Sequence, residues 1–208
     1  RYQYYTSCAI LATTMVVTIL ILLLTLITPT KIIALYDPTS VPNNKFGMHI
    51  VDPNDIGELP VLLNSTGGDW GYVTLVIPDT DRNQDKWQRI FDQMRRLHLI
   101  PIVRLATHVQ GSNWSKPNKD DIRDWTQFLS DLNWPAENRY VIIFNEPNHA
   151  KEWGGNIDPE GYAQILIAFG RELKKASEDF FILPAGLDAS AASDGQSLDE
   201  AAFLTRMK

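Results

Sequence analysis

Apolar and polar residues are distributed very differently in the two parts of this chain. Residues 8–27 consist of 16 apolar side chains and four threonines, and no charged residue lies between Tyr2 and Thr30. A helix of about 20 residues rises about 30 Å, which is enough to cross the hydrocarbon core of a membrane. A cleaved signal peptide has a shorter apolar region, of about 7–15 residues. The pattern therefore predicts one transmembrane helix, within residues 1–30, that is retained as a single-pass anchor.

Cleavage and orientation of this segment stay open. Cleavage near Ala34 is the alternative to retention, and it would release the rest of the chain as a secreted protein. Arg1 and Lys31 flank the apolar segment with equal charge, so the positive-inside rule does not determine its orientation.

The pattern after the apolar segment is that of an α/β domain. Residues 31–44 form a Pro- and Asn-rich linker without periodicity, and residues 45–208 alternate between two kinds of apolar pattern. Continuous apolar runs predict strands at 46–51, 71–78, 100–106, 140–144 and 180–185. Apolar stripes at helical spacing predict helices around residues 87–97, 122–132, 159–173 and 198–208. Asp158 and Pro159 are typical of the start of the third helix.

Strands that alternate with helices in this way predict parallel β/α units, for which two architectures are open. A doubly wound open sheet could be completed by five strands. A (β/α)₈ TIM barrel needs about 250 residues and eight units, so residues 45–208 would be such a barrel truncated after about five units.

Composition and charge narrow the function classes. The chain is 44% apolar and 21% charged, which is typical of a globular protein and excludes wholesale disorder. Its net charge is −6, and residues 32–208 contain 17 basic and 25 acidic side chains. A nucleic-acid-binding domain normally carries a basic face, so we expect no nucleic-acid partner.

Candidate chemistry lies at the carboxyl ends of the predicted strands, where both architectures place their active sites. The polar residues at these ends are His49 and Asp52, then Asp79, Asp81 and Arg82, then Arg104 and His108, then Asn145, Glu146, Asn148 and His149, and finally Asp188. Glu146 comes one residue after a run of five apolar or aromatic residues, 140–144, and precedes Pro147, so its carboxyl group is suited to deliver a proton beside an apolar wall. The alternative is a solvated carboxylate at a helix start.

At these residues the sequence resembles a known clan of enzymes. Val141-Ile142-Ile143-Phe144-Asn145-Glu146-Pro147-Asn148, followed by Trp153-Gly154-Gly155, is similar to the fourth-strand motif of the retaining (β/α)₈ glycoside hydrolases, which include cellulase and xylosidase families. The resemblance covers residues 45–208 and favours the barrel over the doubly wound sheet. It implies that Glu146 is the general acid/base and that Asn145 hydrogen-bonds the 2-hydroxyl of the sugar.

The same resemblance implies a nucleophile that this chain does not supply. A retaining glycosidase needs a second carboxylate about 5–5.5 Å from the acid/base. In the clan this residue is a Glu at the end of the seventh strand, to which no residue here corresponds, and Asp188 does not replace it. We therefore interpret the chain as a fragment of a longer protein that is inactive by itself.

Three further residues are candidates for substrate binding. Arg104 lies within an apolar strand, where the alternative is a structural ion pair. His108 lies where related cellulases carry a sugar-binding His, although a loop position without a role is equally compatible. Trp153, like Trp114, follows a strand and could stack on a sugar ring, with loop packing as the alternative.

These features predict a membrane-anchored glycosidase domain outside the cytoplasm that acts on an oligo- or polysaccharide. The chemistry needs no cofactor and no metal. A metal hydrolase is poorly supported because the sequence has no His-x-His pair on the first strand and no Glu-flanked His pair on a helix. Two hypotheses from different classes stay open: a non-catalytic, membrane-anchored carbohydrate-binding or envelope-structural barrel, and an unrelated open-sheet α/β protein.

Overall fold

The apolar runs of the sequence form one parallel sheet in the computed structural model, which describes residues 46–65 and 67–208. The strands are β1 (Gly47–His49), β2 (Gly71–Pro78), β3 (Leu99–Ala106), β6 (Arg139–Ile143) and β7 (Phe180–Pro184). They are ordered in space as they are in the chain, β1-β2-β3-β6-β7, and every neighbouring pair is parallel. A doubly wound sheet reverses its strand order at a switch point, and this sheet does not.

Helices connect successive strands, and their starts are marked by capping side chains. Asn83 accepts a hydrogen bond from the Lys86 amide at the start of α3, and Asp158 accepts one from the Gly161 amide at the start of α5. The α-helices are α2 (Leu59–Leu63), α3 (Gln84–Arg96), α4 (Ile122–Asp131), α5 (Pro159–Ala176) and α6 (Glu200–Arg206). Short 3-10 helices are η2 (Pro53–Glu58), η3 (Lys119–Asp121) and η4 (Ala150–Glu152).

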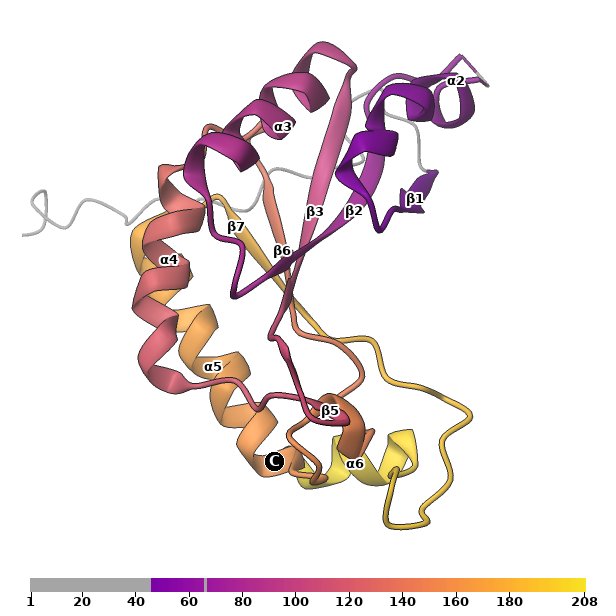
Figure 1. Cartoon of the computed structure of the whole chain (residues 1–208), viewed down its shortest axis with the longest axis vertical. Helices are drawn as coiled ribbons and strands as arrows, with labels where there is room; N and C mark the ends of the chain where they lie inside the picture. Colours follow the sequence, from indigo (N-terminus) through magenta and orange to yellow (C-terminus); the bar gives the residue numbers. More distant parts are fainter. Residues whose placement is uncertain (1–45, 66) are drawn as a thin grey trace, which may run out of the picture. The chain divides into compact units, whose positions relative to one another are not determined.

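The two faces of the sheet have different surroundings. Helices α3, α4 and α5 lie along the same side of the sheet (Figure 1), and we call that side the outer face. Side chains alternate along β2 between buried positions such as Leu75 and partly exposed positions such as Val76. The buried set belongs to the core that the helices cover, whereas the other set forms an open face that is only partly covered.

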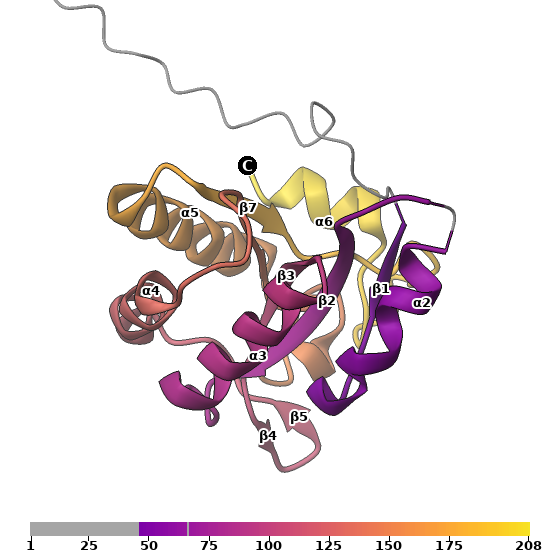
Figure 2. The ribbon, with the colours of Figure 1, turned by 90° about the horizontal axis from the view of Figure 1, so that it is seen from above.

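Long connections follow the carboxyl ends of β3, β6 and β7. The connection after β3 contains an antiparallel hairpin of β4 (Val109–Gln110) and β5 (Asn113–Trp114), which projects from the body of the domain (Figure 2). The connection after β6 contains η4, and the one after β7 runs over residues 185–199 before α6 begins. The connections after β3 and β6 contribute residues to the candidate site.

Most predicted elements are confirmed, with shifts at their ends. The strand predicted at 140–144 ends at Ile143, because Phe144 adopts a left-handed conformation with φ 67° that no regular strand accommodates. The hairpin, η2 and α2 were not predicted.

The predicted transmembrane helix and linker, residues 1–44, lie outside the described residues. Within residues 46–65 and 67–208, no helix combines the length and the apolar character that a membrane crossing requires.

Candidate active site

The backbone at the end of β6 has an unusual conformation on both sides of Asn145. Phe144 has φ 67° and Glu146 has φ 33°, both in the left-handed region that side chains with a Cβ rarely adopt. Such conformations persist only where the surroundings fix them, and they cluster at functional sites. The Phe144 ring is fixed by edge-to-face contacts with Trp153 at 6.2 Å and Phe169 at 5.7 Å between ring centroids.

A half-open pocket of about 450 Å³, counting the part open to solvent, lies beside this turn. Ligand pockets usually combine apolar walls with a few polar groups that orient the ligand. The pocket has both: the ring of Trp114 and the side chain of Val76 line it together with polar groups from three segments. The polar groups are those of Arg104, Thr107, Asn145 and Glu152.

Arg104 is the charged residue in the middle of the open face. It lies between Val76 of β2 and Ile142 of β6 in the register of the sheet. Burial lowers its pKa, and the carboxylates of Glu152 and Glu146 oppose that shift. Its Nε is buried without a hydrogen-bond partner in the described part of the chain. The guanidinium forms no ion pair within 4.0 Å among the described residues, which does not support the structural ion pair that was the alternative.

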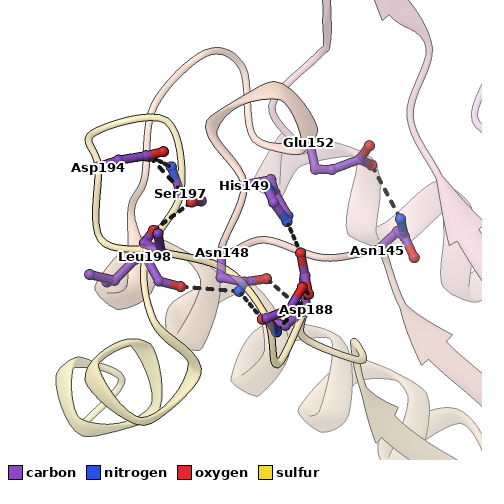
Figure 3. A network of polar contacts seen from close by, with 10 residues as sticks. Asn145, Asn148, His149, Glu152, Asp188, Asp194, Ser197 and Leu198 are labelled. Carbon is purple, nitrogen blue, oxygen red and sulfur yellow. Dashed lines mark hydrogen bonds and ion pairs between the residues drawn. The ribbon is translucent and has the colours of Figure 1, made fainter.

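Glu152 is a site residue that the sequence did not reveal. It is the last residue of η4, and its Oε2 accepts a long hydrogen bond of 3.4 Å from Asn145 Nδ2 (Figure 3). Glu152 also lines the pocket, and of the two carboxylates that raise the pKa of Arg104 it has the larger effect. A carboxylate six residues after Glu146 has no periodicity or motif to distinguish it, so only the fold of η4 identifies it.

Glu146 lies half-buried at the turn, and its main-chain oxygen accepts a hydrogen bond from the His149 amide at 2.9 Å. Among the described residues, its carboxylate forms no hydrogen bond or ion pair. Glu146 does not itself line the pocket, but its charge is one of the two that raise the pKa of Arg104. An unpaired carboxyl group at the mouth of the sheet is available to exchange a proton with a ligand.

His108 follows β3, and residues of neighbouring loops outside the pocket hold its ring. Its Nδ1 is 2.9 Å from Asp79 Oδ2 and 3.4 Å from Ser115 Oγ. Its side chain is half-exposed, so the ring faces solvent beside the pocket and does not line it. His49 is the exposed last residue of β1 and does not line the pocket, and its pKa is lowered by partial burial and by the charge of Arg104.

The two tryptophans that follow strands have different positions. Trp153 is 0% exposed, and its ring packs against Phe144 and, at 5.5 Å, against Tyr162. This placement fits loop packing and leaves no ring face for a sugar, so Trp153 is not a candidate for substrate binding. Trp114 lines the pocket instead. Both tryptophans follow a strand in the sequence, and only their burial in the structure distinguishes the core residue from the pocket residue.

No cluster of three or more His, Cys, Asp or Glu side chains suited to a metal ion occurs in residues 46–65 and 67–208. The His and carboxylate groups near the mouth form pairs instead, such as His108 with Asp79 and His149 with Asp188.

No protein-family model and no curated protein matches this sequence. The structure is similar to that of a monomeric β-xylosidase from Caulobacter crescentus CB15, with a TM-score of 0.53 and 14% identity over 68% of this chain and 35% of that chain. It is also similar to a GH39 β-xylosidase from Caulobacter crescentus, with a TM-score of 0.53 and 14% identity over 72% of this chain and 41% of that chain. This chain therefore spans less than half the length of either enzyme. At this identity the similarity shows the fold alone, a parallel β/α arrangement that this chain shares with part of both β-xylosidases.

Proposed function

We propose that this chain supplies the acid/base half of a retaining glycosidase whose complete fold is a (β/α)₈ barrel. The observation that carries the proposal is the turn after β6, where two left-handed residues present Asn145 and Glu146 beside the pocket of Arg104. A left-handed backbone at the carboxyl end of a strand costs conformational free energy, which a purely structural turn would avoid. The similarity to two β-xylosidases supports the fold.

In this proposal the residues have distinct roles. Glu146 protonates the oxygen of the leaving group and then, as a carboxylate, activates the water that releases the product. Asn145 binds the sugar 2-hydroxyl and Arg104 binds a further substrate group, with Trp114 as an apolar wall of the pocket. His108, which lies outside the pocket, binds parts of a longer substrate that extend beyond it. The mechanism consists of proton transfer and carboxylate attack, and neither step requires a metal or an organic cofactor.

The nucleophile belongs to a part of the protein beyond the described sheet. The mechanism needs a second carboxylate about 5–5.5 Å from Glu146. The open face of the sheet is largely apolar and only partly covered, which is the state expected when a barrel lacks its remaining strands. We therefore place the nucleophile on a later strand of a longer protein.

The proposed substrate is a β-linked oligo- or polysaccharide, and the proposed location is the outer side of a membrane. Residues 1–30 would anchor the enzyme there by a single span, without a nucleic-acid partner. Alkaline carbonate extraction of membranes from expressing cells tests the anchor. Retention of the protein in the membrane pellet supports it, and release into the supernatant contradicts it.

The catalytic proposal is tested by hydrolysis of aryl β-glycosides by the full-length protein and its Glu146→Gln variant. We expect the variant to lose about 10²–10⁴-fold in rate on substrates with a poor leaving group, which need the proton, and much less on activated aryl glycosides. Azide should restore turnover of activated substrates by the Glu146→Ala variant, because a small anion can replace the water that the base activates. The matched control is Glu160→Gln, an exposed carboxylate at the start of α5 that pairs with Arg206.

An unchanged rate for Glu146→Gln would eliminate Glu146 as the acid/base. A wild-type protein that binds oligosaccharides without hydrolysing any of them would favour the non-catalytic carbohydrate-binding barrel.

A further inference from the structure

The loop that carries Glu146 is joined to the loop that follows the next strand. We call residues 144–158 the Glu146 loop and residues 185–199 the β7–α6 loop. The main chains of the two loops pair in antiparallel fashion over three residues each. The pairing consists of two hydrogen bonds and one bridge: Ala150 N to Gln196 O at 2.8 Å, Leu198 N to Asn148 O at 2.9 Å, and His149 with Ser197.

The side chain of Asn148 lies at the centre of this junction and is 0% exposed. Its Nδ2 donates to the carbonyl oxygens of Asp188 at 3.0 Å and Leu198 at 3.1 Å, and its Oδ1 accepts from the Asp188 amide at 3.2 Å (Figure 3). A buried amide is costly unless its donors and acceptor are all satisfied. Asn148 meets this condition with partners 40 and 50 residues away along the chain.

A second contact joins the loops at the surface of the junction. His149 Nε2 lies 2.9 Å from Asp188 Oδ2, and both side chains are about one-third exposed. Asp188 Oδ1 accepts hydrogen bonds from the amide and the hydroxyl of Ser190, at 2.8 and 2.7 Å. The Ser190 and His149 contacts lower the pKa of Asp188, which keeps this carboxylate ionised.

The carboxylate of Glu146 has no hydrogen-bond or ion-pair partner in the described part of the chain, so its position is set by the backbone that carries it. Between Glu146 and Asn148 there is only Pro147, which is buried and whose ring restricts the backbone. The left-handed backbone of Glu146 needs neighbours that hold it in place. Phe144 on one side of Glu146 is held by ring packing against Phe169, and on the other side Asn148 is the nearest residue whose side chain hydrogen-bonds distant partners.

We infer that Asn148 is a positioning residue, which clamps the Glu146 loop to the β7–α6 loop and so holds the carboxyl group of Glu146 at the leaving-group oxygen. This inference rests on the proposed function. It adds that acid catalysis depends on a loop from the following β/α unit, which does not itself touch the reacting atoms.

The test compares two buried asparagines of the same β/α unit in the full-length protein. Asn148→Ala breaks the clamp, whereas Asn138→Ala removes a buried asparagine that precedes β6, at the opposite end of that strand, and donates to Tyr140 Oη at 3.0 Å. Both variants should be less stable to heat. Only Asn148→Ala should lower kcat/KM for poor leaving groups, by about tenfold or more relative to activated leaving groups, because a displaced acid impairs only the steps that need its proton.

Amide hydrogen exchange gives a readout that does not depend on activity. The amides of Ala150 and Leu198 form the junction, so they should exchange faster in Asn148→Ala than in the wild type. Their exchange rates should not change in Asn138→Ala. If Asn148→Ala does not fold, Asp188→Ala carries the same test, because it removes the surface contact while the main-chain partners of Asn148 remain. It should show the same dependence on the leaving group with a smaller loss.

Each outcome decides one claim. An active wild type whose Asn148→Ala and Asp188→Ala variants lose rate equally on both substrate classes overturns the clamp and leaves the proposed function intact. A wild type with no glycosidase activity overturns the proposed function, and with it the catalytic role of Asn148. Unchanged exchange at Ala150 and Leu198 overturns the clamp whatever the activity.

Discussion

The outer face and the open face of the parallel sheet are built from neighbouring residues of the same strands, yet they differ in what covers them. On the outer face, Val73, Val103 and Ile143 are 0% exposed beneath α3, α4 and α5. On the open face, Arg104 and Ile142 are only partly buried. Strands that are apolar at both sets of positions are typical of sheets covered on both sides. The difference indicates that the open face can pack against further structure, which the described residues do not provide.

The largest expected effect comes from adjacent isoleucines on opposite faces of β6. Ile143→Ala should lower the free energy of unfolding by about 2–5 kcal/mol, because it leaves a cavity in a fully buried core. Ile142→Ala should cost only about 1 kcal/mol in this chain, because its side chain is already partly exposed. Urea unfolding monitored by tryptophan fluorescence measures both. In the proposed complete barrel the two losses should become similar, and a persistent difference there would contradict closure of the sheet over Ile142.

A second prediction concerns the polar ties on the outer face. Tyr162 of α5 donates its hydroxyl to Ile143 O at 3.2 Å and accepts from the Ala185 amide at 2.6 Å. Tyr162→Phe should therefore cost about 1–3 kcal/mol, since it leaves buried main-chain groups without partners. Tyr140→Phe, which removes a hydroxyl that accepts from Asn138, should cost less. Tyr140 is two residues before Ile142 on β6, so its side chain is on the open face. Equal losses in thermal or urea unfolding would show that the hydroxyl on the outer face contributes no more to stability than the one on the open face.

The same tyrosine predicts a loss of stability at alkaline pH. Burial raises the pKa of Tyr162 to about 12, whereas the hydrogen bond from Ala185 opposes the shift. Because an unfolded tyrosine releases its proton near pH 10, this contribution is complete below about pH 10 and is lost as the pH rises toward about 12. Urea midpoints at pH 9, 10 and 11 should fall more steeply for the wild type than for Tyr162→Phe. Parallel slopes would assign the alkaline loss to other groups.

The smallest expected change in stability is that of Arg104→Met on the open face. The guanidinium is partly desolvated and lacks a partner for Nε, so an apolar side chain of similar length should alter the free energy of unfolding by no more than about 1 kcal/mol. In the full-length protein the same variant should raise KM for oligosaccharides, because Arg104 lines the pocket. A large loss of stability with unchanged kinetics would identify Arg104 as a structural ion-pair residue.

Much of the secondary structure could be predicted from the sequence because local patterns determine it. The strand at 71–78 agrees with β2 at both ends, and Asp158 and Pro159 start α5 as their capping chemistry predicts. Segments too short to show a period were missed. The β4–β5 hairpin has only two residues in each strand, and its pairing leaves no period in the sequence.

The candidate site was predicted in part. The fold brings Arg104 and Asn145 into one pocket, as strand ends at one edge of a parallel sheet suggest, and their roles remain predictions. Glu152 was not foreseen, and for Trp153 the sequence left stacking on a sugar and loop packing both open, since the two side chains depend on the path of η4 after the turn. Sequence position shows that a residue follows a strand, but not whether its side chain turns toward solvent or toward the core.

The pairing of residues 148–150 with residues 196–198 has a consequence for protein engineering. Loops that follow successive strands of β/α folds are treated as separate modules, each exchangeable without the others. Here, a chimera that received the Glu146 loop alone would bury the amide of Asn148 opposite a foreign loop without matching carbonyls. The Glu146 loop and the β7–α6 loop therefore form a single transplantable cassette, and recombination breakpoints are expected to be tolerated outside the interval 144–199 rather than within it.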